Sequence, residues 1–168
     1  MFHPDVQRVL AAAYMSDCGD VELDSLYARR RELHDVEGQV SYVRRLTQGR
    51  IEILCAELER RDKGGDPADL AELICQLPDV LGGGVTTPST RGGDELQPDD
   101  SFVAHVDVIV GPQIFLALPD YDEAEIDSRV VALEGFERLV SDTRHQLHER
   151  IDLVQCEIAR RFKSMPIG

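Results

Sequence analysis

Apolar residues recur at steps of three and four along two long stretches of the chain, about residues 23–63 and 120–164. Such steps place side chains on one face of a helix, and their persistence over many turns is typical of a coiled-coil seam. Each predicted helix spans roughly 60 Å. The seam residues are Leu33, Val36, Val40, Val43, Ile51, Leu54 and Leu58 in the first stretch, and Val130, Leu133, Phe136, Val140, Leu147, Ile151, Val154, Ile158 and Phe162 in the second.

Signals at the ends of these stretches favour two separate helices. Lys63 is followed by Gly64 and Gly65, a pattern typical of a helix C-terminus. Asp120, with Glu123 three residues later, resembles a capping box at the start of the second helix. We therefore expect long helix 1 over residues 23–63 and long helix 2 over residues 120–164.

The shorter segments are less regular. Residues 1–22 are expected to form a tail with a short helix over 4–15, because a proline such as Pro4 is tolerated in a first helical turn. Residues 66–81 begin with Asp-Pro, which is typical of a helix N-terminus, and predict another short helix.

Residues 82–119 connect that short helix to long helix 2. Gly, Pro, Thr and Asp dominate residues 82–100, which predicts a flexible linker. A β-branched run within 102–118 precedes Gly111 and Pro112. We interpret this part as a short strand or an extended segment that covers apolar surface.

The two long stretches match each other at an offset of 100 residues, which indicates an internal duplication. The matched apolar pairs include Leu33 with Leu133 and Val40 with Val140. The matched charged residues are Arg50, Glu57, Arg60 and Arg61, with Arg150, Glu157, Arg160 and Arg161. We expect the arginine pairs at 60–61 and 160–161 to act as C-terminal charges that favour the helix dipole.

Neither long helix can bury its seam alone, so the sequence predicts that the two pack on each other. The predicted fold class is all-α: an antiparallel two-helix coiled coil from an internal duplication, with short accessory helices and a flexible linker.

A polar motif, Glu-x3-Ser-x2-Arg-x3-(Gln/His)-x3-(Glu/Asp), occurs once in each long helix. At about 100° per residue its members fall within an arc of roughly 80°, beside the apolar seam, and extend over about 22 Å. The first copy is Glu37, Ser41, Arg44, Gln48 and Glu52, and the second is Glu137, Ser141, Arg144, His148 and Asp152.

These residue types suit a guanine nucleotide. Arginine presents a planar fork to guanine O6 and N7, while a carboxylate accepts from N1–H and the exocyclic amine. Serine and arginine can also bind phosphate. Two matched stripes facing each other would fit a ligand with two-fold symmetry. Polar residues beside a coiled-coil seam are common, however, so the same residues also fit a solvated helix border.

Charge and composition narrow the classes of partner. The formal net charge is −14, which repels nucleic acid and anionic membranes and favours a basic protein partner. The N-terminus lacks a cationic leader, so we expect no signal peptide and a cytoplasmic location. The cysteines at 18, 55, 75 and 156 are widely spaced, which predicts free thiols and no disulfide framework or zinc site.

The two motifs resemble the E-x3-S-x2-R-x3-Q-x3-D signature of the RsiG family of actinobacterial anti-sigma factors. SYVRRLTQGRIEIL at 41–54, LPDVL at 77–81 and HERIDLVQCEIARR at 148–161 are also similar to that family. The resemblance covers most of residues 23–163. It implies an antiparallel coiled coil that binds cyclic di-GMP between its long helices and, when loaded, sequesters a WhiG-type sporulation sigma factor.

The resemblance implies that all ten motif residues named above bind the nucleotide. Two of them depart from the signature. Glu52 replaces Asp, which keeps the carboxylate but extends it by one methylene, and His148 replaces Gln, which changes the hydrogen-bonding geometry. The resemblance implies no metal and no direct contact with nucleic acid or membrane.

Other functions remain open at this point. An enzyme is not favoured, because no base is placed to activate Ser41 or Ser141 within the motifs. His145, His148, Glu149 and Asp152 lack the spacings of known di-iron or zinc helices. A ligand-independent coiled-coil adaptor and a cyclic di-GMP effector with a different partner are the remaining alternatives.

Overall fold

The computed structural model describes residues 3–65 and 100–164, and all regular elements in these ranges are helices. The short helix expected over 66–81 and residues 82–99 of the linker expected over 82–100 lie outside the described residues, whereas Asp100 begins a helix. No helix in the described ranges is long and apolar enough to cross a membrane. The chain divides into two compact units, which we describe separately: unit 1 is Met1–Tyr42 with Val140–Gly168, and unit 2 is Val43–Leu139.

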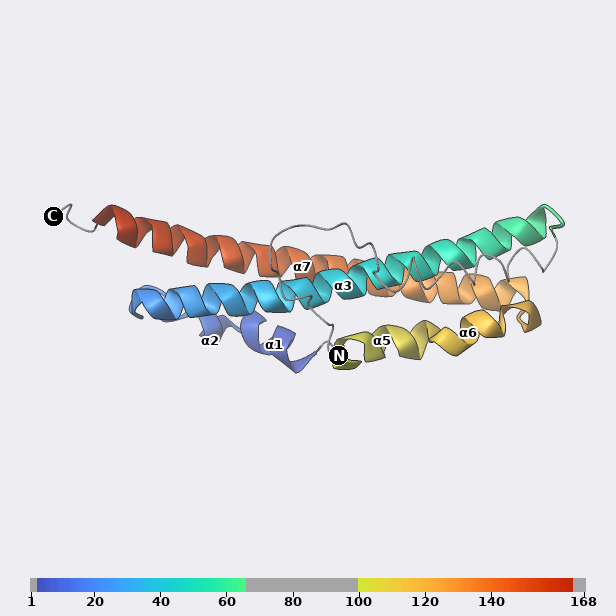
Figure 1. Cartoon of the computed structure of the whole chain (residues 1–168), viewed down its shortest axis with the longest axis horizontal. Helices are drawn as coiled ribbons and strands as arrows, with labels where there is room; N and C mark the ends of the chain where they lie inside the picture. Colours follow the sequence, from blue (N-terminus) through green and yellow to red (C-terminus); the bar gives the residue numbers. More distant parts are fainter. Residues whose placement is uncertain (1–2, 66–99, 165–168) are drawn as a thin grey trace, which may run out of the picture. The chain divides into compact units, whose positions relative to one another are not determined.

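Unit 1 contains α1 (Pro4–Leu10), α2 (Ala12–Met15), the first part of α3 (Leu23–Asp62) and the last part of α7 (Glu123–Ser164). Within this unit α3 and α7 lie side by side and run in opposite directions (Figure 1). The apolar residues at helical spacing form the core of this unit, as predicted. Its buried residues are Val6, Val9, Leu26, Leu33, Val36, Val40, Val140, Leu147, Ile151, Val154 and Ile158.

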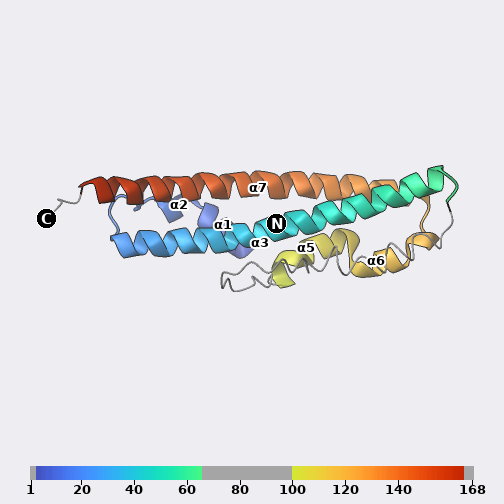
Figure 2. The same cartoon turned by 45° about the horizontal axis from the view of Figure 1, so that its top comes forward.

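Unit 2 contains the remainder of α3 and α7 together with α5 (Asp100–Val110), α6 (Pro112–Leu116) and the 3-10 turn η1 (Leu118–Asp120). Here too α3 and α7 are antiparallel, and α5 and α6 lie beside them (Figure 2). The buried apolar residues are Val43, Leu46, Ile53, Leu54, Phe102, Val106, Val110, Ile114, Phe115, Leu118, Ile126, Val130 and Leu133. The predicted all-α, antiparallel two-helix coiled coil with short accessory helices is confirmed.

The seam was predicted well but not completely. Phe162 is 52% exposed, and Ile51, Leu58 and Phe136 are only half-buried. Ile53, which lies off the predicted seam, is 5% exposed. In unit 2 the accessory helices add a second apolar surface, so burial extends around α3 beyond the residues that face α7.

The ends of the long helices follow from local chemistry. Gly64 has a φ of +69°, and the N–H groups of Gly64 and Gly65 donate to the carbonyls of Arg61 and Arg60 at 2.9 Å. This left-handed glycine cap ends α3 where the sequence predicted. The capping box of α7 lies two residues later than predicted, because Asp120 belongs to η1. Asp122 and Glu125 form it instead, at 2.8 and 2.9 Å.

Residues 102–118 are helical, so the prediction of a strand or extended segment is wrong. They form parts of α5, α6 and η1, with a break at Gly111 before Pro112. Phe102, Val106 and Val110 are all buried, and their spacing of four residues is that of one helix face. Packing of this face within unit 2 overrides the β-propensity of the valines, which is a weak and context-dependent preference.

The expected helix over residues 4–15 is interrupted at Ala11, whose ψ of 144° is extended. In a continuous helix the carbonyl of Leu10 would accept the N–H of Tyr14. In unit 1 it accepts a hydrogen bond from Arg150 Nη2 at 3.0 Å instead. A long-range arginine therefore replaces the helical hydrogen bond at the break.

The contact between this arginine and the end of a short helix recurs in unit 2. There Arg50 takes the place of Arg150, and Val110 takes the place of Leu10. Arg50 donates to the carbonyl of Val110, at the end of α5, and its Nη2 lies 2.6 Å from Asp107. The duplication therefore includes the short helices, so that α1 and α2 correspond to α5 and α6. The sequence analysis missed this part of the repeat because few side chains there are identical.

Arg61 and Arg161 hold the segment that follows each pair of short helices. In unit 2, Arg61 donates to the carbonyls of Leu118 and Tyr121 at 2.7 and 2.6 Å. In unit 1, Arg161 donates to the carbonyls of Cys18, Gly19 and Val21, the first two at 2.9 and 3.0 Å. Their predicted role as helix-end charges is therefore incomplete, since they also bind a distant turn.

Candidate functional site

Four residues of the two motifs meet in unit 1 around the carboxylate of Glu37. Glu37 Oε1 accepts hydrogen bonds from Ser41 Oγ at 2.6 Å and from Arg144 Nε at 2.9 Å. Arg144 Nε also lies 2.8 Å from Ser41 Oγ, and His148 Nε2 lies 3.3 Å from Glu37 Oε1. Glu37 and Ser41 come from α3, and Arg144 and His148 come from α7. We call this cluster half-site 1.

The charge state of Glu37 is set by opposing effects. Its side chain is 16% exposed, and burial alone would raise the pKa of its carboxyl. Hydrogen bonds from Ser41 and Arg144, with the charge of His148, outweigh burial and hold the pKa below its usual range. Half-site 1 therefore presents an ionised acceptor beside a guanidinium at neutral pH.

Half-site 2 lies in unit 2 and has the same design with the roles of the helices exchanged. Glu137 Oε1, on α7, accepts from Arg44 Nε at 3.1 Å and from Gln48 Nε2 at 3.2 Å, both on α3. Gln48 and His148 occupy matched positions, and each holds a nitrogen at nearly the same distance from the matched glutamate. The histidine thus preserves the position of the amide nitrogen.

Half-site 2 opens onto a groove with a volume of about 510 Å³. Among the motif residues, Gln48, Glu52 and Glu137 line it. The sequence analysis did not select the other lining residues, which are Ile51, Glu134 and Arg138. Glu134 lies one helical turn before Glu137, so the i, i+3 spacing was a usable signal.

The remaining motif residues, Ser141 and Asp152, lie on the part of α7 that belongs to unit 1. Ser141 is half-buried, and Asp152 is exposed. The structure therefore brings the glutamate of each motif to the arginine and the Gln/His of the other motif.

This arrangement is suited to recognition. Each half-site combines a carboxylate acceptor with a guanidinium and a second nitrogen, which is a set able to bind a planar ligand edge. Within residues 3–65 and 100–164, no group of three or more His, Cys, Asp or Glu is placed to hold a metal ion. Cys18, Cys55 and Cys156 are free thiols, and Cys75 lies outside the described residues.

Comparison with known proteins supports the family resemblance. Residues 12–81 match the family model described as RsiG-like, and this match confirms the resemblance noted in the sequence. The matched segment contains the whole first motif, Glu37 to Glu52. No curated protein matches the chain. The RsiG-like family is one of regulatory anti-sigma factors.

Proposed function

We propose that this RsiG-like chain is an anti-sigma factor that binds cyclic di-GMP with the residues of its two motifs and, when loaded, sequesters a WhiG-type sigma factor. The observation that carries the proposal is the crosswise meeting of the motifs. Glu37 pairs with Arg144, and Glu137 pairs with Arg44, with a matched nitrogen beside each glutamate. A solvated helix border would not require matched partners on the opposite helix.

The chemistry of each half-site fits a guanine nucleotide, and cyclic di-GMP contains two guanines and two phosphates. A guanine offers N1–H and an exocyclic amine to a carboxylate, and O6 and N7 to an arginine. Phosphate is a second possible partner for the arginine. Binding would replace each Arg–Glu ion pair with contacts to the ligand, so each carboxylate and guanidinium keeps a hydrogen-bonding partner in the complex.

The proposed partner also fits the electrostatics of the chain. A net charge of −14 favours association with the basic DNA-reading surfaces of a sigma factor and opposes contact with nucleic acid. Loading with the nucleotide would favour one arrangement of the helices. If the sigma factor binds that arrangement preferentially, ligand and partner strengthen each other's binding.

Calorimetric titration with cyclic di-GMP tests the ligand. The Arg44→Ala/Arg144→Ala variant is expected to lose binding by at least about 100-fold, because each half-site loses a charged donor. The matched control is Arg45→Ala/His145→Ala, which changes the next residue in each motif, where both side chains are exposed. It should bind like wild type. Equal affinity of the double arginine variant and wild type would contradict the site assignment.

A second candidate function is a ligand-independent adaptor that binds the sigma factor constitutively. The observation in its favour is that the motif arginines and glutamates already satisfy one another. Helix stability that does not change with millimolar cyclic di-GMP, together with unchanged sigma binding, would support this function. A cyclic di-GMP effector with another partner would instead show nucleotide binding without sigma binding.

A further inference from the structure

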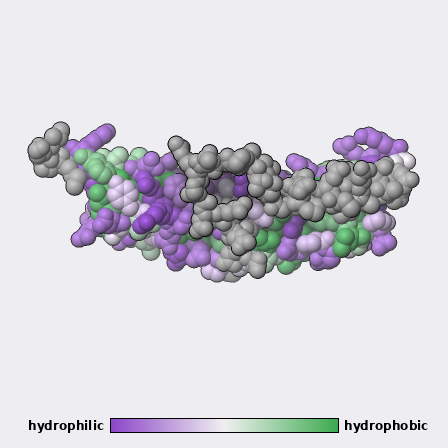
Figure 3. Space-filling view, in the orientation of Figure 1, coloured by the Kyte–Doolittle hydropathy of each residue, from purple (hydrophilic) through white to green (hydrophobic). Residues whose placement is uncertain are grey.

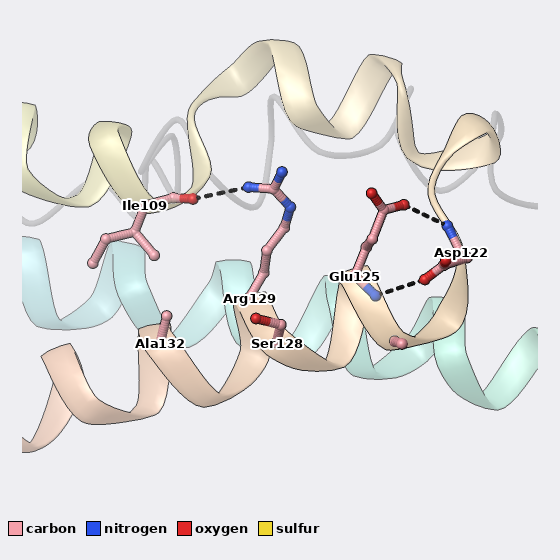
Figure 4. Close-up of a pocket in the computed structure, with 7 residues that line it drawn as sticks. Ile109, Asp122, Glu125, Ser128, Arg129 and Ala132 are labelled. Atoms are coloured by element: carbon pink, nitrogen blue, oxygen red, sulfur yellow. Dashed lines mark hydrogen bonds between the residues drawn. The ribbon is translucent and has the colours of Figure 1, made fainter.

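Unit 2 contains a larger groove, separate from both half-sites, with a volume of about 670 Å³. It lies between the start of α7 and the accessory helices, and Arg129 points from α7 toward α5 (Figure 4). Its walls combine apolar and charged residues: Ile109, Asp122, Ala124, Glu125, Ser128, Arg129 and Ala132. None of these residues belongs to the motifs.

The duplication supplies a comparison within the same protein. In unit 1 the positions matched to Ala132 and Ile114 are Glu32 and Tyr14, and the hydroxyl of Tyr14 donates to Glu32 at 2.5 Å. Arg8, matched to Val108, pairs with Glu32 at 2.7 Å. These bulky polar side chains bind one another in unit 1. Unit 2 has smaller or apolar side chains at the same positions.

Three exposed apolar residues of unit 2 have polar residues at the matched positions of unit 1. Val108, Leu116 and Val131 are 86%, 77% and 57% exposed. Val108 precedes Ile109 in α5 and Val131 precedes Ala132 in α7, and Ile109 and Ala132 line the groove. The matched positions in unit 1 are Arg8, Ser16 and Arg31. Hydrophobic surface is visible over α5 and α6 in Figure 3.

The charges near this surface restrict its occupant. Asp122 and Glu125 form one end of the groove, and the exposed residues around them include Glu123 and Asp127. Residues 66–99 of the same chain have Arg91 as their single basic residue, with seven acidic ones: Asp66, Asp69, Glu72, Asp79, Asp94, Glu95 and Asp99. Like charge therefore opposes covering by the chain's own segment and favours a basic partner.

Arg129 lies in the wall of this groove. Its guanidinium lies 4.7 Å from the centre of the Tyr121 ring, and its Nη1 donates to the carbonyl of Ile109 at 3.3 Å. Its Nε is buried and has no acceptor among the described residues. The contacts with Tyr121 and Ile109 fix the guanidinium of Arg129 against the wall of the groove.

We propose that the groove, together with the exposed apolar residues Val108, Leu116 and Val131 of the same unit (the border residues), is the docking surface for a basic amphipathic helix of the partner protein. Apolar side chains of that helix cover the valines and Leu116, and its lysines and arginines face Asp122 and Glu125. This proposal rests on the proposed function, because the sigma factor is taken as the partner that supplies the helix.

The test exchanges the border residues for those of the other copy: Val108→Arg, Leu116→Ser and Val131→Arg in one chain. Each new residue already occurs on the surface of the matched unit, so the fold should tolerate it. The control is Phe162→Asp, which exchanges an exposed apolar residue of unit 1 for its counterpart Asp62. Affinity for a WhiG-type sigma factor is measured with cyclic di-GMP at saturation, and nucleotide binding is measured without the sigma factor.

We expect the triple exchange to weaken sigma binding by at least about tenfold, as loss of an interface anchor does, with nucleotide binding unchanged. Phe162→Asp should leave both unchanged. Equal sigma affinity of the triple exchange and wild type would overturn the docking proposal alone. Wild type that fails to bind the sigma factor would overturn the proposed function as well.

Two further measurements separate the other possible occupants. Sedimentation velocity shows whether wild type self-associates and the triple exchange does not, which would assign the surface to a second copy of the chain and overturn the proposal. Hydrogen exchange that accelerates over residues 66–81 in the triple exchange, with sigma affinity unchanged, would assign it to the chain's own segment.

Discussion

At the scale of single residues, the two copies of the motif show which property each position retains. Gln48 and His148 differ in chemistry, yet their Nε2 atoms lie 3.2 and 3.3 Å from the matched glutamates. Glu52 lines the groove of half-site 2 with its longer side chain. Position is thus conserved between the copies more closely than residue type, which is what a binding site requires.

Glu57 and Glu157 give a prediction about stability. Each accepts hydrogen bonds from the two arginines that follow it, but the side chain of Glu57 is 0% exposed and that of Glu157 is 17% exposed. Glu57→Gln is expected to lower the free energy of unfolding by about 1–3 kcal/mol, because the arginines lose a buried charged acceptor. Urea denaturation measures it, with Glu157→Gln as the matched control, which should cost less. An equal loss would contradict the importance of burial.

The carboxyl of Glu157 predicts how the stability of the fold depends on pH. Hydrogen bonds from Arg160 and Arg161 lower the pKa of Glu157 from 4.5 to about 2. A carboxyl with a depressed folded pKa stabilises the fold above its unfolded pKa, and this contribution is lost as the pH falls toward the folded value. The stability difference between wild type and Glu157→Gln should therefore be constant above pH of about 5 and shrink toward pH of about 2. A difference that is independent of pH in urea titrations would refute this assignment.

At the scale of helices, arginines on α3 and α7 bind the accessory elements through backbone carbonyls. Arg50 and Arg61 hold α5 and η1 in unit 2, and Arg150 and Arg161 hold α1 and the turn after α2 in unit 1. A guanidinium donates to several carbonyls at once, and hydrogen bonds to charged groups are stronger than neutral ones. Accessory helices too short to be stable alone are thereby fixed to a long helix.

Arg61→Met and Arg161→Met should show reciprocal local effects. Removal of the guanidinium of Arg61 is expected to lower the opening free energy of residues 112–122 by about 1.5–3 kcal/mol, with little change over residues 12–22. Arg161→Met should do the reverse. Native-state hydrogen exchange resolves the two segments, so each variant is the control for the other. Exchange that accelerates equally in both segments would argue against local binding by these arginines.

At the scale of the molecule, the duplication has produced two units that share several internal contacts and differ in their surfaces. The paired glutamates and arginines, the carbonyl-binding arginines and the short helices all recur at the offset of 100 residues. The exposed apolar residues Val108, Leu116 and Val131 have polar counterparts. Shared contacts fit the recognition of a symmetric ligand, whereas different surfaces allow an asymmetric protein partner.

The proposed coupling of ligand and partner gives a prediction for the whole molecule. Cyclic di-GMP should tighten sigma binding by a factor of about 5–150, and the sigma factor should tighten nucleotide binding by the same factor, because the linkage is reciprocal. Calorimetry in both orders of addition measures the two factors. Arg44→Ala/Arg144→Ala should remove the effect of nucleotide on sigma binding. Sigma affinity that is identical with and without nucleotide would instead favour the constitutive adaptor.

The sequence by itself determined the long helices, their antiparallel packing and the register of the duplication. Those features depend on apolar periodicity and on capping residues such as Gly64, which act locally and are visible in one dimension. The ten motif residues could be selected for the same reason. Their role in nucleotide binding stays a prediction.

Only the tertiary structure decided which motif residues meet and how residues 102–118 fold. The contact of Glu37 with Arg144 joins residues more than 100 positions apart, and no local pattern specifies it. The β-branched run of α5 is helical because Phe102, Val106 and Val110 bury one face in unit 2. Packing energy from such a face exceeds the small intrinsic preference of valine for strands, so the local signal was misleading there.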